Sequence, residues 1–103
     1  AFIANHKTIL NEVVLIDYPK KDVKAIAFIT GKTSTSLIPD KSGLPRYFNV
    51  FVPTTPNPTS GFMLLVPETE IVRLPHLTVE DALKVIISPG SITPEDLLEP
   101  TVR

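Results

Sequence analysis

Two apolar runs near the start of the chain have the composition of β-strands. Residues 11–18 and 23–30 are rich in β-branched side chains, and the runs end at Pro19 and Gly31. The residues between them, 19–22, suit the length and chemistry of a hairpin turn. The pattern therefore predicts two neighbouring antiparallel strands.

Three later runs extend the strand pattern. Residues 47–52 and 62–66 are predicted to be strands, and residues 70–74 a short fifth strand. Several of these runs are apolar on both faces, whereas strands in an antiparallel sheet usually alternate because one face meets water. The second face therefore needs its own cover, which a helix, a closed barrel or another subunit would supply.

A helical pattern begins at Thr78. Its hydroxyl is placed to accept the free backbone N–H of Asp81, and two acidic residues lie at the positive end of the helix dipole. The helix is expected to stop at Pro89 and Gly90. One stripe of it is apolar: Val79, Ala82, Leu83 and Ile86, widened by Val85 and Ile87.

These elements predict an α+β fold. It is expected to be a mainly antiparallel β-sheet of about five strands, barrel- or sandwich-like, with a C-terminal helix covering it. The 103 residues are expected to form a single domain over 1–103. Residues 32–46 are predicted to be a mobile loop, and residues 91–103 a tail with one short helical turn.

Residues 53–61 are here called the Pro/Thr segment. Pro53, Pro56 and Pro58 restrict their own φ angles and the residues before them, so the segment is predicted to be rigid. Its N–H groups, hydroxyls and carboxamide could bind a carboxylate, a phosphate or a partner backbone, or could satisfy only their own loop. The candidate binding residues are Thr54, Thr55, Asn57, Thr59, Ser60 and Gly61.

The Pro/Thr segment also carries a family resemblance. Residues 51–67, FVPTTPNPTSGFMLLVP, resemble the signature of the domain of unknown function 502 family, whose plant members are the continuous-vascular-ring-like proteins. Residues 13–19, 27–31 and 78–84 are similar to other parts of the family pattern, whereas residues 32–46 and those after Gly90 are not. Where the family usually has Gly after a basic pair, this chain has Asp22.

The resemblance implies a membrane-embedded parent protein. Such a parent has two transmembrane helices ahead of this domain, so the chain is expected to be a soluble fragment, on the cytoplasmic side, of a longer membrane protein. It implies no known catalytic activity.

Charge and composition exclude several classes of function. The formal net charge is −1, from ten basic and eleven acidic residues, so no broad field favours nucleic acid as a partner. The absence of cysteine excludes disulfides and thiolate chemistry. The two histidines, His6 and His76, form no paired metal motif and stand beside no clear nucleophile. We therefore predict no catalytic residue, no metal site and no cofactor.

A lysine cluster is the remaining charged feature. Lys20, Lys21 and Lys24 lie at the first hairpin turn, where they could contact anionic lipid headgroups or could be an ordinary solvated turn. The function that these features favour is a non-catalytic module that acts through self-association as a homo-oligomer or through a protein partner. The alternative is a domain that binds a small molecule or lipid headgroup through the Pro/Thr segment.

Overall fold

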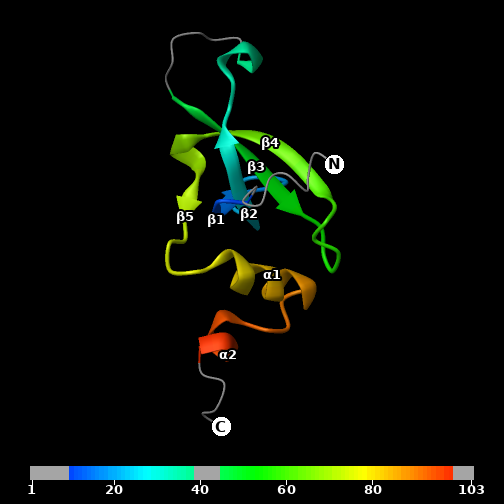
Figure 1. Ribbon diagram of the computed structural model, residues 1–103. Coiled ribbons are helices and arrows are strands. Elements are labelled where there is room, and N and C mark those ends of the chain that lie inside the picture. The colour runs from blue at the N-terminus through cyan, green and yellow to red at the C-terminus, as the bar shows by residue number, and fades with distance from the viewer. Residues whose placement is uncertain (1–9, 39–44, 99–103) are drawn as a thin grey trace.

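The described residues form one antiparallel sheet with a helix on one of its faces. The computed structural model describes residues 10–38 and 45–98. The predicted α+β class, the strands and the two helical segments are confirmed (Figure 1). The elements are β1 (Glu12–Asp17), β2 (Lys24–Lys32), β3 (Tyr47–Pro53), β4 (Gly61–Pro67), β5 (Val72–Arg73), α1 (Val79–Ile87) and α2 (Pro94–Leu98), with short 3-10 turns η2 (Thr35–Leu37) and η3 (Glu68–Glu70).

The loop predicted over 32–46 is partly ordered structure. β2 extends to Lys32 and η2 occupies 35–37, while positions 39–44 lie outside the described residues. In the predicted tail, α2 supplies the short helical turn, and residues 99–103 again lie outside the described part. The mobility of the 32–46 loop stays a prediction.

The strands lie in the order β4-β3-β2-β1-β5 and every neighbouring pair is antiparallel. The predicted β1–β2 hairpin is confirmed, with pairs from Glu12–Ile29 to Asp17–Lys24. Asp22 in its turn has a φ of 71°, in the left-handed region that favours glycine. Its N–H donates to the Asp17 carboxylate at 3.2 Å, which ties the turn back to the end of β1.

Each face of the sheet carries its own apolar core. On the helix face, Val13 and Phe28 pack against Ala82 and Ile86 of α1. The opposite face, here called the inner face, carries a larger cluster: Val14, Ile16, Ala27, Ile29, Phe48, Val50, Val52 and Val66. The two apolar faces of the strands are therefore buried in different ways. Helix α1 covers one face, and the inner face is enclosed because the sheet curls.

The curl follows from the short link between the two edges of the sheet. β4 and β5 are the outermost strands, yet only residues 68–71 lie between them. Fully extended, that link spans at most about 18 Å, whereas five flat strands extend about 19 Å across. Most of the link is the 3-10 turn η3, which rises only about 2 Å per residue. The edges must therefore approach each other, and the sheet cannot be flat.

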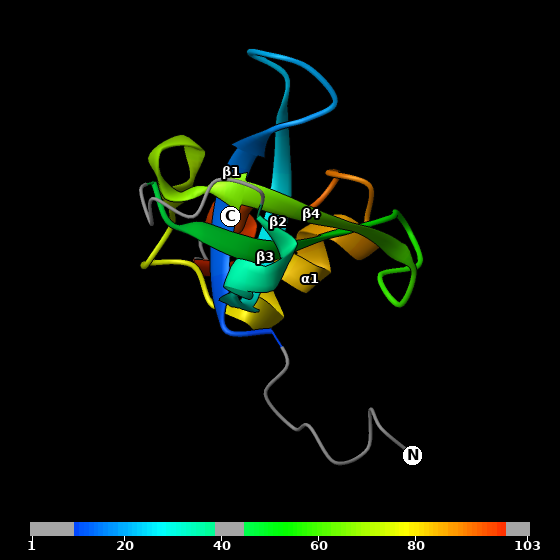
Figure 2. The same cartoon turned by 90° about the horizontal axis from the view of Figure 1, so that it is seen from above.

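A β-bulge adds to this curvature. The β2–β3 register shifts between Ile29 and Gly31, and a bulge bends its strand and increases the local twist. In Figure 2, β1 and β2 run across the direction of β3 and β4. The sheet nevertheless stays open, because β4 and β5 do not pair. The expected barrel- or sandwich-like shape is thus a single strongly curled sheet and not a closed barrel.

Helix α1 forms as its sequence predicts. The Thr78 hydroxyl accepts from the Asp81 N–H at 3.0 Å. Ala82 and Ile86 are buried, and the Glu80 and Lys84 charges lie 4.0 Å apart on the outer face. Ile87 differs from expectation because it is 51% exposed, so the apolar stripe is narrower than the sequence indicated.

Gly61 is required by a close backbone approach at the start of β4. A Cβ on Gly61 would lie 2.1 Å from the Val52 carbonyl oxygen and 2.9 Å from the Phe51 ring. Carbonyl oxygens in a paired strand cannot move aside without breaking the ladder. At Gly31, by contrast, a Cβ would meet no atom within 4 Å.

We therefore expect Gly61→Ala to lower the free energy of unfolding by about 1–3 kcal/mol, the usual cost of an overpacked site. Gly31→Ala is the matched control and should change stability by no more than about 1 kcal/mol, because the added methyl group meets open space. Urea denaturation followed by circular dichroism measures both. Equal effects at the two glycines would contradict the close-approach explanation.

Candidate functional site

The Pro/Thr segment is the tight connection between β3 and β4. Thr54 donates its N–H to the Ser60 carbonyl at 2.8 Å, and its hydroxyl donates to the Asn57 carbonyl at 2.7 Å. The Asn57 carboxamide oxygen accepts from both the N–H and the hydroxyl of Thr59, at 3.2 and 2.6 Å. Several polar groups of the segment therefore bond to one another within the segment.

Thr55 joins the segment to the helix. Its hydroxyl donates to the carbonyl of Ile86, which is one of the last carbonyls of α1 and has no partner inside the helix. The neighbouring carbonyl of Val85 accepts from the Gly90 N–H at 2.9 Å and from the Ser88 hydroxyl at 2.9 Å. The Pro/Thr segment thus completes the C-terminal cap of α1 and fixes that end of the helix against the sheet.

The structure brings the candidate binding residues together, but several of their hydrogen-bond donors already have acceptors in the protein. Three N–H donors, those of Thr54, Thr59 and Ser60, have acceptors inside the segment. The hydroxyls of Thr54, Thr55 and Thr59 are likewise engaged. Gly61 is the first residue of β4 and lies opposite Pro53 in the β3–β4 register. Ligand binding by this segment stays a prediction.

Asn57 is the centre of the internal bonds, which gives a direct test. Asn57→Ala removes the acceptor for two Thr59 donors and should lower the free energy of unfolding by about 0.5–1.5 kcal/mol. Asn57→Asp keeps acceptor oxygens in the same place and should retain most of the stability. Urea unfolding of the two variants checks this, and an Asp variant as unstable as the Ala variant would contradict a local acceptor role.

The three lysines of the first hairpin do not form one free cluster. Lys24 pairs with the Asp17 carboxylate. Lys20 and Lys21 line an open hollow of about 480 Å³ together with Asp17 and Glu70, so two acids face the two bases. Charges of both signs make this a poor match for a purely anionic surface. Contact between these lysines and lipid headgroups stays a prediction.

The Asp17–Lys24 pair has a defined dependence on pH. The hydrogen bond from Lys24, with that from the Asp22 N–H, holds the pKa of Asp17 below its usual value. The same bond raises the pKa of Lys24. The lowered Asp17 pKa stabilises the fold above the unfolded value of about 3.9, and this contribution is lost as pH falls through the folded value. The Lys24 contribution is present below about 10.4 and is lost as pH rises through its folded value.

We expect Lys24→Met to return the pKa of Asp17 towards its usual value, because the strongest bond to the carboxylate is removed. An NMR titration of the side-chain carboxyl carbons measures this. Lys20→Met serves as the control, since Lys20 makes no hydrogen bond to Asp17 in the described structure and should leave the Asp17 pKa unchanged. An Asp17 pKa that is the same in the wild type and the Lys24 variant would contradict the assignment.

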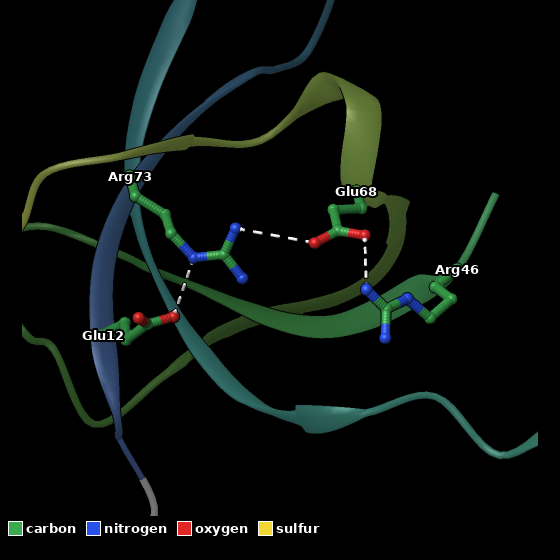
Figure 3. Close-up of polar contacts among 4 residues, drawn as sticks. All are labelled: Glu12, Arg46, Glu68 and Arg73. Carbon is green, nitrogen blue, oxygen red and sulfur yellow. Dashed lines mark hydrogen bonds and ion pairs between the residues drawn. The ribbon is translucent and has the colours of Figure 1, made fainter.

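A network of alternating charges lies where the sheet curls, and the sequence alone did not point to it. Arg73 of β5 contacts Glu12 of β1 at 3.2 Å and Glu68 of η3 at 3.8 Å, and Glu68 contacts Arg46 at 3.4 Å (Figure 3). The Arg73 guanidinium also lies 5.5 Å from the centre of the Phe48 ring. The network therefore joins β5 to β1, to η3 and to the residue just before β3, beside the Phe48 ring of the inner face.

In the sequence, the one feature that could have indicated this network is an arginine inside a short predicted strand. Arg73 interrupts the otherwise apolar end of residues 70–74, but its partner Glu12 is 61 positions away in sequence. These side chains are partly exposed, so each ion pair contributes little to the free energy of unfolding. Together the pairs hold β1, β5 and η3 in a fixed arrangement.

The remaining candidate chemistry is sparse. His76 is exposed, and His6 lies outside the described residues. Within residues 10–38 and 45–98, no group of three or more metal-binding side chains comes together. In the same part of the chain, no helix is long and apolar enough to cross a membrane.

Comparison with known families assigns the chain. Residues 1–60 match the family described as "Protein of unknown function (DUF502)", which is more than half of the 103 residues. The chain belongs to this family. The DUF502 match includes β1, β2, β3 and the Pro/Thr segment up to Ser60, and it ends before β4. No curated protein and no solved structure matches the chain.

Proposed function

We propose that this DUF502 chain is a non-catalytic domain of a membrane-embedded parent protein, on its cytoplasmic side, and that it acts by self-association. The membrane parent is what the family resemblance implies. The observation that carries self-association is the exposure of large apolar side chains on β4: Phe62 is 53% exposed and Met63 is 64% exposed. Exposed apolar groups on an outer strand are typical of protein contact surfaces.

The arrangement of polar groups supports a non-catalytic role. Among the described residues every buried side chain is apolar, whereas enzymes commonly use a desolvated acid, base or nucleophile. The alternative function, ligand binding by the Pro/Thr segment, needs free donors. The backbone N–H groups of three of its residues, Thr54, Thr59 and Ser60, donate to acceptors inside the segment. This supports a protein-contact role over a ligand site.

Light scattering coupled to size-exclusion chromatography tests the proposal. The monomer mass is 11.3 kDa, and we expect the measured mass of the purified domain to rise above it as concentration increases. Dilution should reverse the rise, because a specific contact is an equilibrium and an aggregate is not. A monomeric mass at every concentration would overturn self-association.

A further inference from the structure

We propose that the outer edge of β4 pairs antiparallel with β4 of a second copy, about a two-fold axis at Leu64, to form a sheet that continues across the dimer. This inference rests on the proposed self-association and names the surface that performs it. In the described part of the chain, β4 is the last strand on its side of the sheet.

The two edges of the sheet differ in how well they are protected. β5 is only two residues long and carries Arg73, and short charged edges resist pairing with other chains. β4 is seven residues long, and its sequence GFMLLVP contains no charge. A long apolar edge strand without such protection presents its free backbone groups as a template for another strand.

Hydrogen bonds at both ends of β4 establish which backbone groups face outward. Thr54 donates to Ser60 at 2.8 Å, and Glu68 donates to Arg46 at 2.7 Å. The β3–β4 register continues between these two pairs without a shift. Since hydrogen-bonded positions alternate in an antiparallel pair, the even-numbered residues of β4 bond to β3. The outward-facing groups therefore belong to four residues: Gly61, Met63, Leu65 and Pro67.

This outward set is complementary to itself. With the axis at Leu64, Met63 lies opposite Leu65 of the second copy, and each donates to and accepts from the other. Gly61 then lies opposite Pro67 of the second copy, so its N–H donates to the one outward residue that has no N–H of its own. All outward N–H groups find acceptors, and the strand pairs over its full length. A shift of two residues would leave part of the strand unpaired.

The side chains suit the same register on both faces. On the helix face, exposed Met63 would pack against Leu65 of the second copy. On the inner face, Leu64 would meet its own copy across the axis, and Phe62 would lie opposite Val66. No charge is buried by this contact, because residues 61–67 carry none.

The contact is small. A seven-residue strand is about 24 Å long, and a stable interface usually buries about 800 Å² per partner. The dimer is therefore expected to be weak and concentration-dependent in solution. Attachment of both copies to one membrane would raise their effective concentration and favour pairing.

A charge placed on the edge tests the surface. Met63→Lys puts like charges near the axis and should weaken dimerisation by about tenfold or more, as measured by sedimentation velocity over a range of concentrations. Val72→Lys is the matched control: Val72 is 52% exposed on the opposite edge strand, and the change should leave dimerisation as in the wild type. Thermal melts of both variants establish that each is folded.

Cysteine crosslinking tests the register, because the chain has no cysteine of its own. Two copies of Leu64→Cys would face each other at a position without hydrogen bonds, where Cα atoms lie about 4.5 Å apart and a disulfide fits. Met63→Cys pairs would be about 7–8 Å apart and should crosslink far less. Val72→Cys should not crosslink above background.

The outcomes separate the two proposals. If the wild type associates while Met63→Lys associates equally well and Leu64→Cys does not crosslink, the β4 surface is wrong and self-association stands. Preferential crosslinking of Met63→Cys would overturn the register. A wild type that stays monomeric at all concentrations overturns both.

Discussion

The short link from β4 to β5 is the constraint on which the rest of the structure depends. Residues 68–71 join the two outermost strands, so the sheet must curl until its edges come close at that end. Curling encloses the inner face and lets it hold a core without a covering helix. It also places Arg73 over the Phe48 ring and beside Glu68, and this cluster stabilises the curled shape once it has formed.

The Pro/Thr segment has a structural role that its polar composition did not reveal. Its prolines and its internal bonds make it a rigid connection, and Thr55 uses its hydroxyl to cap the end of α1. The segment thus positions the helix that covers the second face of the sheet. The motif that carries the family resemblance thus joins the two layers of the fold.

The proposed self-association depends on the sheet edge that the described residues leave uncovered. The curl and Arg73 protect one edge of the sheet, and α1 packs over β1 and β2 on the helix face. β4 remains as a long apolar strand with its odd-numbered backbone groups facing outward. At Gly61, the first residue of β4, the backbone lies in close contact with β3, so the position of the edge strand is fixed from its first residue. A rigid edge of this kind is suited to pairing with another strand.

The sequence by itself determined the local elements and the fold class. Strand composition, hairpin chemistry and the Thr78 cap depend on residues close together in the chain. The first four strands, the hairpin and the cap appear where the pattern predicts, whereas the strand predicted over 70–74 is only two residues long. Only the tertiary structure decided that Thr55 caps α1 across 31 positions and that Arg73 reaches Glu12 across 61. Such contacts depend on how the sheet curls, and the curl depends on the strand order, which no local pattern encodes.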